Sequence, residues 1–213
     1  LLADPMSHDV LDRQVRRDAV TAMLTTSVLE GYAGYMWARA NGLSAGTTAT
    51  LATGGDFGFM WGYNVAAMSG SDRIEWDTAR SRAMLAGSWT GLVLGQVLAS
   101  HRQYSYGDAL VMRNMGYLGI LVSTTIADLT QKPHQRDPRV YSAALLSGSL
   151  LGLAYGDRQV QDYNFEPSDG VSLQLGTAAG AVMGFGVTAL ANNHSSRGYW
   201  IGATTGALVG YHV

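Results

Sequence analysis

Residues 84–129 read MLAGSWTGLVLGQVLASHRQYSYGDALVMRNMGYLGILVSTTIADL, and this stretch decides the fold. It begins as an apolar segment with glycines at 87, 91 and 95, passes through a polar break at residues 101–108, and continues as a second apolar segment with glycines at 116 and 119. Two apolar runs of helical length separated by a short polar break predict two helices joined by a turn.

The pattern recurs at an interval of 61 residues without any gap. A forward shift places Gly87, Gly91, Gly95, Asp108 and Gly119 on Gly148, Gly152, Gly156, Asp169 and Gly180. A backward shift places the glycines at 95, 116 and 119 on glycines at 34, 55 and 58. A period of this length is typical of helical-hairpin repeats, in which each unit stacks on its neighbours because it cannot cover its own apolar face.

The repeat predicts the organisation of the chain. We expect a lead-in at residues 1–13, three repeat units at 14–70, 71–131 and 132–193, and the first half of a fourth unit at 194–213, so that the natural protein would continue beyond Val213. Within these units we expect helices at about 9–38, 47–68, 78–100, 109–129, 139–156, 170–191 and 199–213. The expected signals are Asn41-Gly42 at the end of the first helix, Asp108 as an N-cap, and Asp137-Pro138 at the start of the fifth helix.

The glycines are expected to be helix contacts. Each costs roughly 1 kcal/mol relative to alanine in a helix interior, so packing has to compensate. A spacing of four residues places them on one ridge, where a neighbouring backbone can approach closely. Strands are the alternative reading, but residues 143–146 and 150–153 lack the alternation that strands require. The sequence therefore predicts an all-α array joined by glycine-zipper ridges, with helix-packing positions at Gly87, Gly91, Gly95, Gly148, Gly152, Gly156 and Gly180.

Composition excludes several classes of function. The net charge is -2 and the chain has a single lysine, which argues against a nucleic-acid partner. With no cysteine and five histidines that form no pair at ligand spacing, no metal site is expected. There is no phosphate loop, nucleophile elbow or dinucleotide fingerprint, so we expect neither a cofactor nor an enzyme.

The remaining polar residues have two readings each. An acidic turn formed by Asp157, Asp162, Glu166 and Asp169 lacks the ordered spacing of a calcium loop, and a solvated loop is the simpler reading. Three charges fall inside expected helices, where they either face the surface or form a polar seam or pore between helices: Glu30, Asp56 and Arg113.

The sequence leaves membrane insertion open. Residues 83–100, 140–156 and 170–193 contain no charged side chain, and Lys and Arg concentrate in alternate connections. Against insertion stand an overall mean hydropathy of +0.04 and the three charges inside expected helices.

The function predicted from these features is a non-enzymatic structural or assembly subunit of a bacterial cell-envelope complex, periplasmic or outer-membrane-associated. Other protein subunits are the expected partners, within an oligomer or a larger complex, with possible membrane contact. The alternative is an integral membrane helical bundle that acts as a channel or transporter-like subunit, with Glu30, Asp56 and Arg113 along the pathway.

Overall fold

A computed structural model describes residues 36–69, 78–132, 136–191 and 195–212. This part of the chain is helical and contains no strand, so the expected all-α class is confirmed and the strand alternative is wrong for it. The chain divides into two units, residues 1–44 and residues 45–213.

Most of the expected first helix lies outside the described residues. Residues 36–40 are helical, and Gly42 follows them with a φ of 63°, the left-handed conformation that glycine adopts most readily. The Leu43 N–H donates to the Ala38 carbonyl at 3.0 Å, which closes a Schellman motif. The glycine C-cap expected at Asn41-Gly42 is therefore present.

The second unit contains six described helices: α2 (Ala45–Met68), α3 (Thr78–His101), α4 (Tyr106–Thr130), α5 (Pro138–Asp162), α6 (Pro167–Leu190) and α7 (Ser196–His212). Their order and most of their bounds follow the expectation. The clearest difference is α5, which was expected to end at Gly156 and continues to Asp162. The added turns are held in place partly by Asp157, which accepts hydrogen bonds from Tyr104 and from Gln161.

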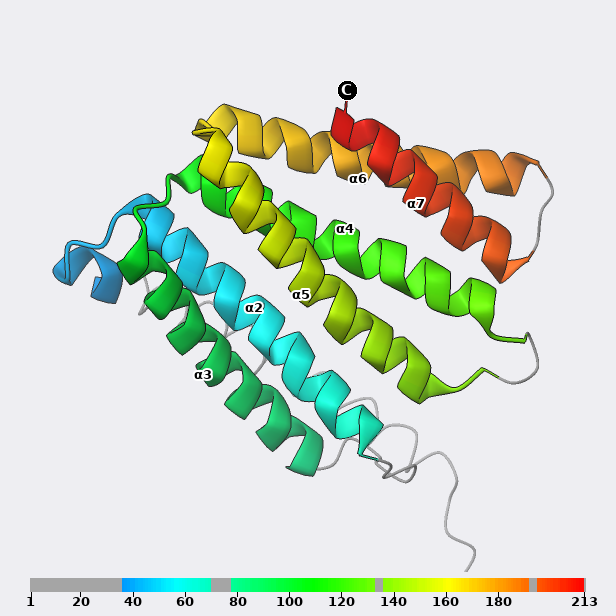
Figure 1. The fold of residues 1–213 in the computed structure, drawn as a ribbon, viewed down its shortest axis with the longest axis horizontal. Helices are drawn as coiled ribbons and strands as arrows, with labels where there is room; N and C mark the ends of the chain where they lie inside the picture. The colour runs from blue at the N-terminus through cyan, green and yellow to red at the C-terminus, as the bar shows by residue number, and fades with distance from the viewer. Residues whose placement is uncertain (1–35, 70–77, 133–135, 192–194, 213) are drawn as a thin grey trace, which may run out of the picture. The chain divides into compact units, whose positions relative to one another are not determined.

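The six helices pack mainly as three antiparallel pairs, α2 with α3, α4 with α5, and α6 with α7 (Figure 1). The principal partner of α3 is α2, the helix before it, rather than α4. Between the pairs, α2 contacts α4 and α5, and α4 contacts α6 and α7. The first helix of one pair thus covers both helices of the next, and α4 lies at the centre. Six antiparallel helices also return the chain to the end from which it started, so Ala45 and His212 both lie toward that end.

Helix starts are fixed by capping boxes, and here one expected role changes. Asp108 is not the N-cap of α4: Ser105 is, and its hydroxyl accepts from the Asp108 N–H while the Asp108 carboxylate accepts from the Ser105 N–H at 2.8 Å. Asp108 is therefore the third helical residue, because the helix starts earlier than the apolar run suggests. At α6, Glu166 and Asp169 form the equivalent box.

The α5 start follows the expectation. Asp137 is the N-cap and its carboxylate accepts from the Arg139 N–H at 2.9 Å, while Pro138 occupies the first helical position. Proline there loses no backbone hydrogen bond.

Two small apolar clusters form around α4. One joins Tyr104, Val111, Met112 and Val160, and the other joins Met115, Leu118, Ala207 and Tyr211. Also on α4, the fully buried ring of Phe57 from α2 covers Gly116, where a methyl group would lie 2.3 Å from the ring. These contacts make α4 the best-covered helix of the bundle.

Candidate functional site

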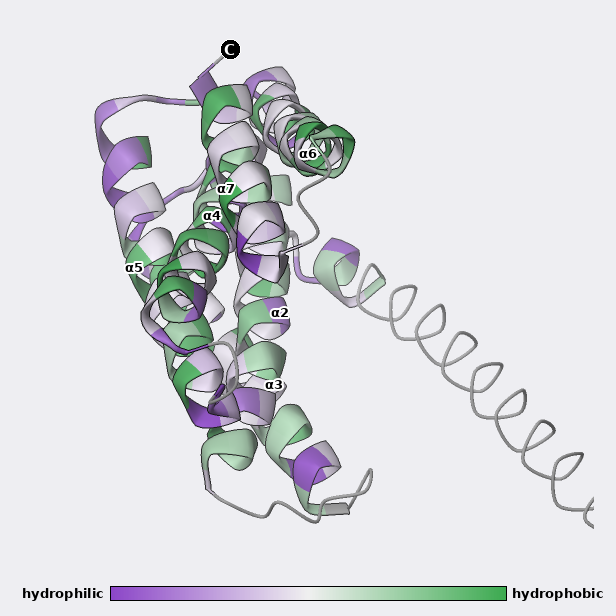
Figure 2. Ribbon diagram, turned by 90° about the vertical axis from the view of Figure 1, so that its right-hand side faces the viewer, coloured by the Kyte–Doolittle hydropathy of each residue, from purple (hydrophilic) through white to green (hydrophobic). Residues whose placement is uncertain are grey.

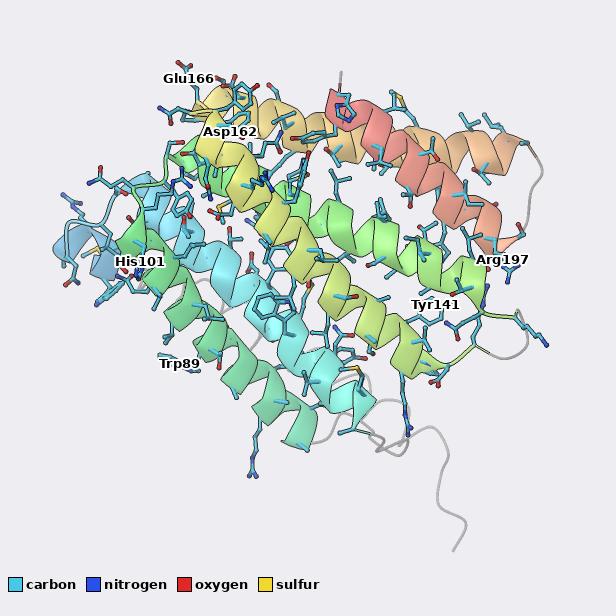
Figure 3. The ribbon with its side chains drawn as sticks, in the orientation of Figure 1. Trp89, His101, Tyr141, Asp162, Glu166 and Arg197 are labelled. Carbon is cyan, nitrogen blue, oxygen red and sulfur yellow. The ribbon has the colours of Figure 1, made fainter. Side chains whose placement is uncertain are left out.

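The most distinctive surface of the bundle is apolar. Large side chains stand exposed along α3, α5 and α6, including Trp89 at 69%, Leu151 at 72% and Val182 at 72% relative exposure. In Figure 2 the strongest hydrophilic colour lies mostly toward helix ends and connections, and hydrophobic or intermediate colour covers most other helical turns. Trp89 points away from α3 in Figure 3. In water, each large apolar side chain left exposed forgoes roughly 1.5–3 kcal/mol. A surface of this extent marks a contact with lipid or with other protein.

Within the described residues, three helices are long and apolar enough to cross a membrane: α3, α4 and α6. They differ in how well the rest of the bundle covers them. Only 6% of the most apolar window of α6 and 11% of that of α3 are buried, against 56% for α4. The two helices with the most exposed apolar surface therefore lie outside, and α4 lies inside.

The interior combines the apolar clusters around α4 with many polar side chains. The side chains of Thr, Ser, Asn and Asp supply the buried polar set: Thr50, Thr53, Asn64, Asp108, Asn114, Thr124, Thr125, Asp128, Ser142, Ser149, Thr177 and Thr204. Several of them bond between helices. The Asn114 amide donates to the Thr177 hydroxyl at 2.9 Å, joining α4 to α6, and the hydroxyls of Thr125 and Thr204 lie 2.6 Å apart, joining α4 to α7.

Each of the seven glycines expected at helix contacts lies against another helix. Gly87, Gly91 and Gly95 of α3 face α2, Gly148, Gly152 and Gly156 of α5 face α4, and Gly180 of α6 faces α7. A methyl group on Gly91 would lie 2.0 Å from the Gly54 carbonyl oxygen, and one on Gly180 would lie 2.1 Å from that of Gly206. Contacts this short leave room for hydrogen only.

The partner glycines are not among the helix-packing positions expected from the sequence, although the repeat includes those at 58 and 119. Apart from Gly119 of α4, they lie on α2 at 54, 58 and 62, on α6 at 176 and 184, and on α7 at 202, 206 and 210. The available signal was the same four-residue spacing, which each of these stretches carries. Gly186 is different: nothing lies within 4 Å of the position its Cβ would take.

Two of the three charges expected to form a polar seam do meet. The Arg113 guanidinium on α4 lies 2.6 Å from the Asp56 carboxylate on α2, and it also lies over the Tyr117 ring. Both charged side chains keep about two fifths of their surface exposed, at 37% and 46%. Glu30 lies outside the described residues. The pair neutralises itself across one helix contact and does not continue as a chain of charges.

At each end of the α4–α5 pair, a carboxylate of one helix accepts a hydrogen bond from a tyrosine. That tyrosine lies on the other helix or in the connection just before it. At one end the Tyr104 hydroxyl donates to Asp157 at 2.6 Å, and burial, together with this hydrogen bond, raises the pKa of Tyr104 well above its ordinary value. At the other end the Tyr141 hydroxyl donates to Asp128 at 2.6 Å, and Arg136 lies 2.9 Å from the same oxygen. These bonds fasten both ends of the pair.

The acidic turn does not assemble into a cation site. Asp157 is engaged by Tyr104, and Asp169 accepts the Glu166 N–H at 2.9 Å as part of the capping box. Among the described residues, no three His, Asp or Glu side chains lie close enough to hold a metal ion.

An open apolar groove of about 770 Å³ runs along the α6–α7 pair. Its floor is the glycine contact between the two helices, and its walls include Met183, Val187 and Val209. The groove carries no charged side chain and is mainly apolar, and its polar side chains are the hydroxyls of Ser172, Thr188 and Thr205.

No protein-family model, curated protein or solved structure matches this chain, and its function has to be argued from the geometry described above.

Proposed function

We propose that this protein is a membrane-embedded, non-enzymatic structural subunit of a bacterial cell envelope, in which the helices of the bundle cross the lipid. The observation that carries the proposal is the exposure of large apolar side chains along α3, α5 and α6, around an interior that holds many polar side chains, several of them bonded between helices. A bilayer accepts the outside without cost and makes the interior hydrogen bonds worth forming.

Helix length supports the same proposal. A helix of 24 residues is about 36 Å long, enough for the roughly 30 Å hydrocarbon core. Three helices meet this length with sufficient apolar character, and α6 does so with almost no cover from the protein. The sequence alone favours a soluble or peripheral form over a membrane-embedded one. The present proposal adopts the embedded form instead.

The glycine contacts supply the cohesion that such a bundle needs. Lipid tails are as apolar as leucine, so helices in a membrane associate through close packing and interhelical hydrogen bonds rather than through apolar burial. We propose that the contacts between Gly54 and Gly91, Gly119 and Gly148, and Gly180 and Gly206 are glycine zippers. The 61-residue period belongs to this proposal, since Gly87 and Gly148 occupy equivalent places on α3 and α5.

A structural role is favoured over a channel. A conduction pathway through a bundle needs charged or polar groups free to meet the permeant species. The Asp56 and Arg113 charges instead meet each other, and several interior hydroxyl and amide groups, such as those of Asn114 and Thr125, bond between helices.

An arginine placed on α6 tests the membrane proposal. Val182 is 72% exposed and lies well inside α6, so Val182→Arg would put a charge into lipid. We expect this variant of the full chain to lose most of its carbonate-resistant membrane fraction. The matched control, Gln103→Arg in the exposed connection before α4, should insert like the wild type.

Equal membrane insertion of the two variants would contradict the membrane proposal. If Val182 faces water, an arginine there is harmless, and both variants would behave alike. A wild-type chain that stays monodisperse without detergent would likewise refute the proposal.

A flux measurement separates the structural role from the channel. Reconstituted Asp56→Asn protein should pass no more and no less ion current than the wild type, with both at the level of empty vesicles. A wild-type current that the substitution alters would favour the channel instead.

A further inference from the structure

The two ends of the described bundle carry opposite charge. We call one the basic end, where α3, α5 and α7 begin: it carries six basic residues, Arg80, Arg82, Lys132, Arg136, Arg139 and Arg197, against two acidic ones, Asp128 and Asp137. The other is the acidic end, where α4 and α6 begin: it carries five acidic residues, Asp108, Asp157, Asp162, Glu166 and Asp169, against two basic ones, Arg102 and Arg158. Figure 3 shows Asp162 and Glu166 together at one end, and Tyr141 and Arg197 at the other.

Local pairing leaves the excess of positive charge at the basic end unchanged. Asp128 is buried and already neutralised by Arg136, while Arg82, Lys132 and Arg139 are exposed. Arg197 donates to the Gln131 carbonyl, which holds its charge close to the turn after α4. The positive charges of Arg82, Lys132 and Arg139 are therefore presented to the outside of the basic end.

Aromatic side chains accompany both ends. Trp200 lies near the start of α7 at the basic end, and Tyr106 and Tyr163 lie at the acidic end, all three exposed. Tryptophan and tyrosine prefer the level of the lipid headgroups, so both ends have the composition of a membrane interface. The charge difference is what distinguishes them.

We infer that the basic end faces the cytoplasm, among the anionic headgroups of the inner leaflet, and that the acidic end faces the opposite side. This inference rests on the proposed membrane embedding. Short connections that hold Lys and Arg stay on the cytoplasmic side during insertion, whereas Asp and Glu weigh little. The segment 70–77 lies outside the described residues and carries Arg73 with three acidic side chains, to which the rule is insensitive.

The absence of cysteine from the sequence makes a direct test possible. Ala191→Cys places a single exposed thiol in the turn after α6, at the basic end, and Asn164→Cys places one in the turn after α5, at the acidic end. Intact bacteria that express either full-length variant are treated with a membrane-impermeant maleimide, with and without permeabilisation. We expect the thiol at 164 to react in intact cells, and the thiol at 191 to react only after permeabilisation, with at least a tenfold difference in labelling.

A charge-reversal variant tests the cause. Changing Arg82, Lys132 and Arg139 together to Glu removes exposed positive charge from the basic end without touching the buried Asp128 pair. In the Ala191→Cys background it should raise labelling in intact cells severalfold. The control replaces the same three residues with Lys, Arg and Lys, which keeps the charge and should leave labelling unchanged.

The outcomes separate the two proposals. Any other labelling pattern from a chain that remains in the carbonate-washed membrane overturns the orientation and leaves the embedding intact. Labelling unaffected by charge reversal also overturns the orientation argument. A chain released by carbonate overturns the embedding itself.

Discussion

The indole Nε1 of Trp61 on α2 donates a hydrogen bond of 2.8 Å to the hydroxyl of Ser149 on α5, and Ser149 is completely buried. The bond joins the α2–α3 pair to the α4–α5 pair, and the two bonded residues lie 88 positions apart in the sequence. The same two pairs also meet through the Asp56–Arg113 ion pair and through the Phe57 ring, which covers Gly116.

Removing this acceptor should destabilise the bundle. Ser149→Ala leaves the indole N–H without its partner, at a cost of roughly 1–3 kcal/mol, and Trp61→Phe should remove most of that penalty in the double variant. The measurement is the unfolding midpoint in detergent. Ser147→Ala, two positions away on the exposed side of α5, is the control and should leave the midpoint unchanged. Strict additivity of the two changes would show that the bond contributes nothing.

A methyl group at a glycine contact should be costly only where another helix lies against it. Gly91→Ala brings a methyl to 2.0 Å from the Gly54 carbonyl oxygen, so α2 and α3 must separate, at about 1–3 kcal/mol. Gly186→Ala meets nothing within 4 Å and should be neutral or stabilising by up to roughly 1 kcal/mol, because alanine favours helix. Equal midpoints for these two variants would contradict the close contact between α2 and α3.

Neutralising one member of the Asp56–Arg113 pair should cost more than removing both. In water such a half-exposed pair contributes about 0–1 kcal/mol, but an unpaired charge in lipid is penalised far more heavily. We therefore expect Asp56→Asn and Arg113→Gln each to reduce the folded fraction in bilayers, and the double variant to recover much of it. If the double variant lost as much of its folded fraction in bilayers as each single variant, a lipid-exposed pair would be contradicted.

Loss of Asp108 should loosen both the start of α4 and the turn before α6. Its carboxylate accepts from the Ser105 N–H at 2.8 Å and from the Phe165 N–H at 3.0 Å. Asp108→Ala is expected to cost about 1–2 kcal/mol and to speed hydrogen exchange at both amides. Asp162→Ala, at an exposed position, provides the control. Unchanged exchange at Phe165 would mean that the link to the second turn does not form.

Alkaline pH should weaken the bundle through Tyr104. Its folded-state pKa is raised, so the neutral hydroxyl contributes stability that is fully present below about pH 10, the unfolded pKa, and is lost as the pH rises toward the folded pKa. The free energy of unfolding should therefore fall above pH 10, and Tyr104→Phe should make the fall shallower. A slope that Tyr104→Phe leaves unchanged would contradict the hydrogen bond to Asp157.

Sequence periodicity predicts helices well here because each apolar run is bounded by a polar break. The starts are harder to predict, since the capping signal at Asp108 comes from its carboxylate reaching back to Ser105 and not from its own position before the helix. The end of α5 was missed for a related reason: Asp157 is polar in sequence but is satisfied within the structure by Tyr104.

Partner choice is the part that sequence leaves undetermined. A four-residue glycine spacing predicts that Gly91 lies on a contact ridge, but it contains no information on whether Gly54 or a glycine of α4 lies opposite. The Asp56–Arg113 pair shows the same limit, because two charges 57 positions apart meet only once α2 and α4 have packed. Such pairings are determined by how the helices pack in the tertiary structure and not by the local sequence pattern.

The even number of described helices in residues 45–212 has a consequence for what the bundle can hold together. Ala45 and His212 lie toward the same end, so soluble domains fused before α2 and after α7 would share one compartment. Under the proposed membrane embedding, such a bundle would hold both attachments on a single face of the membrane. It would not carry a mechanical connection from one attachment to the other across the lipid.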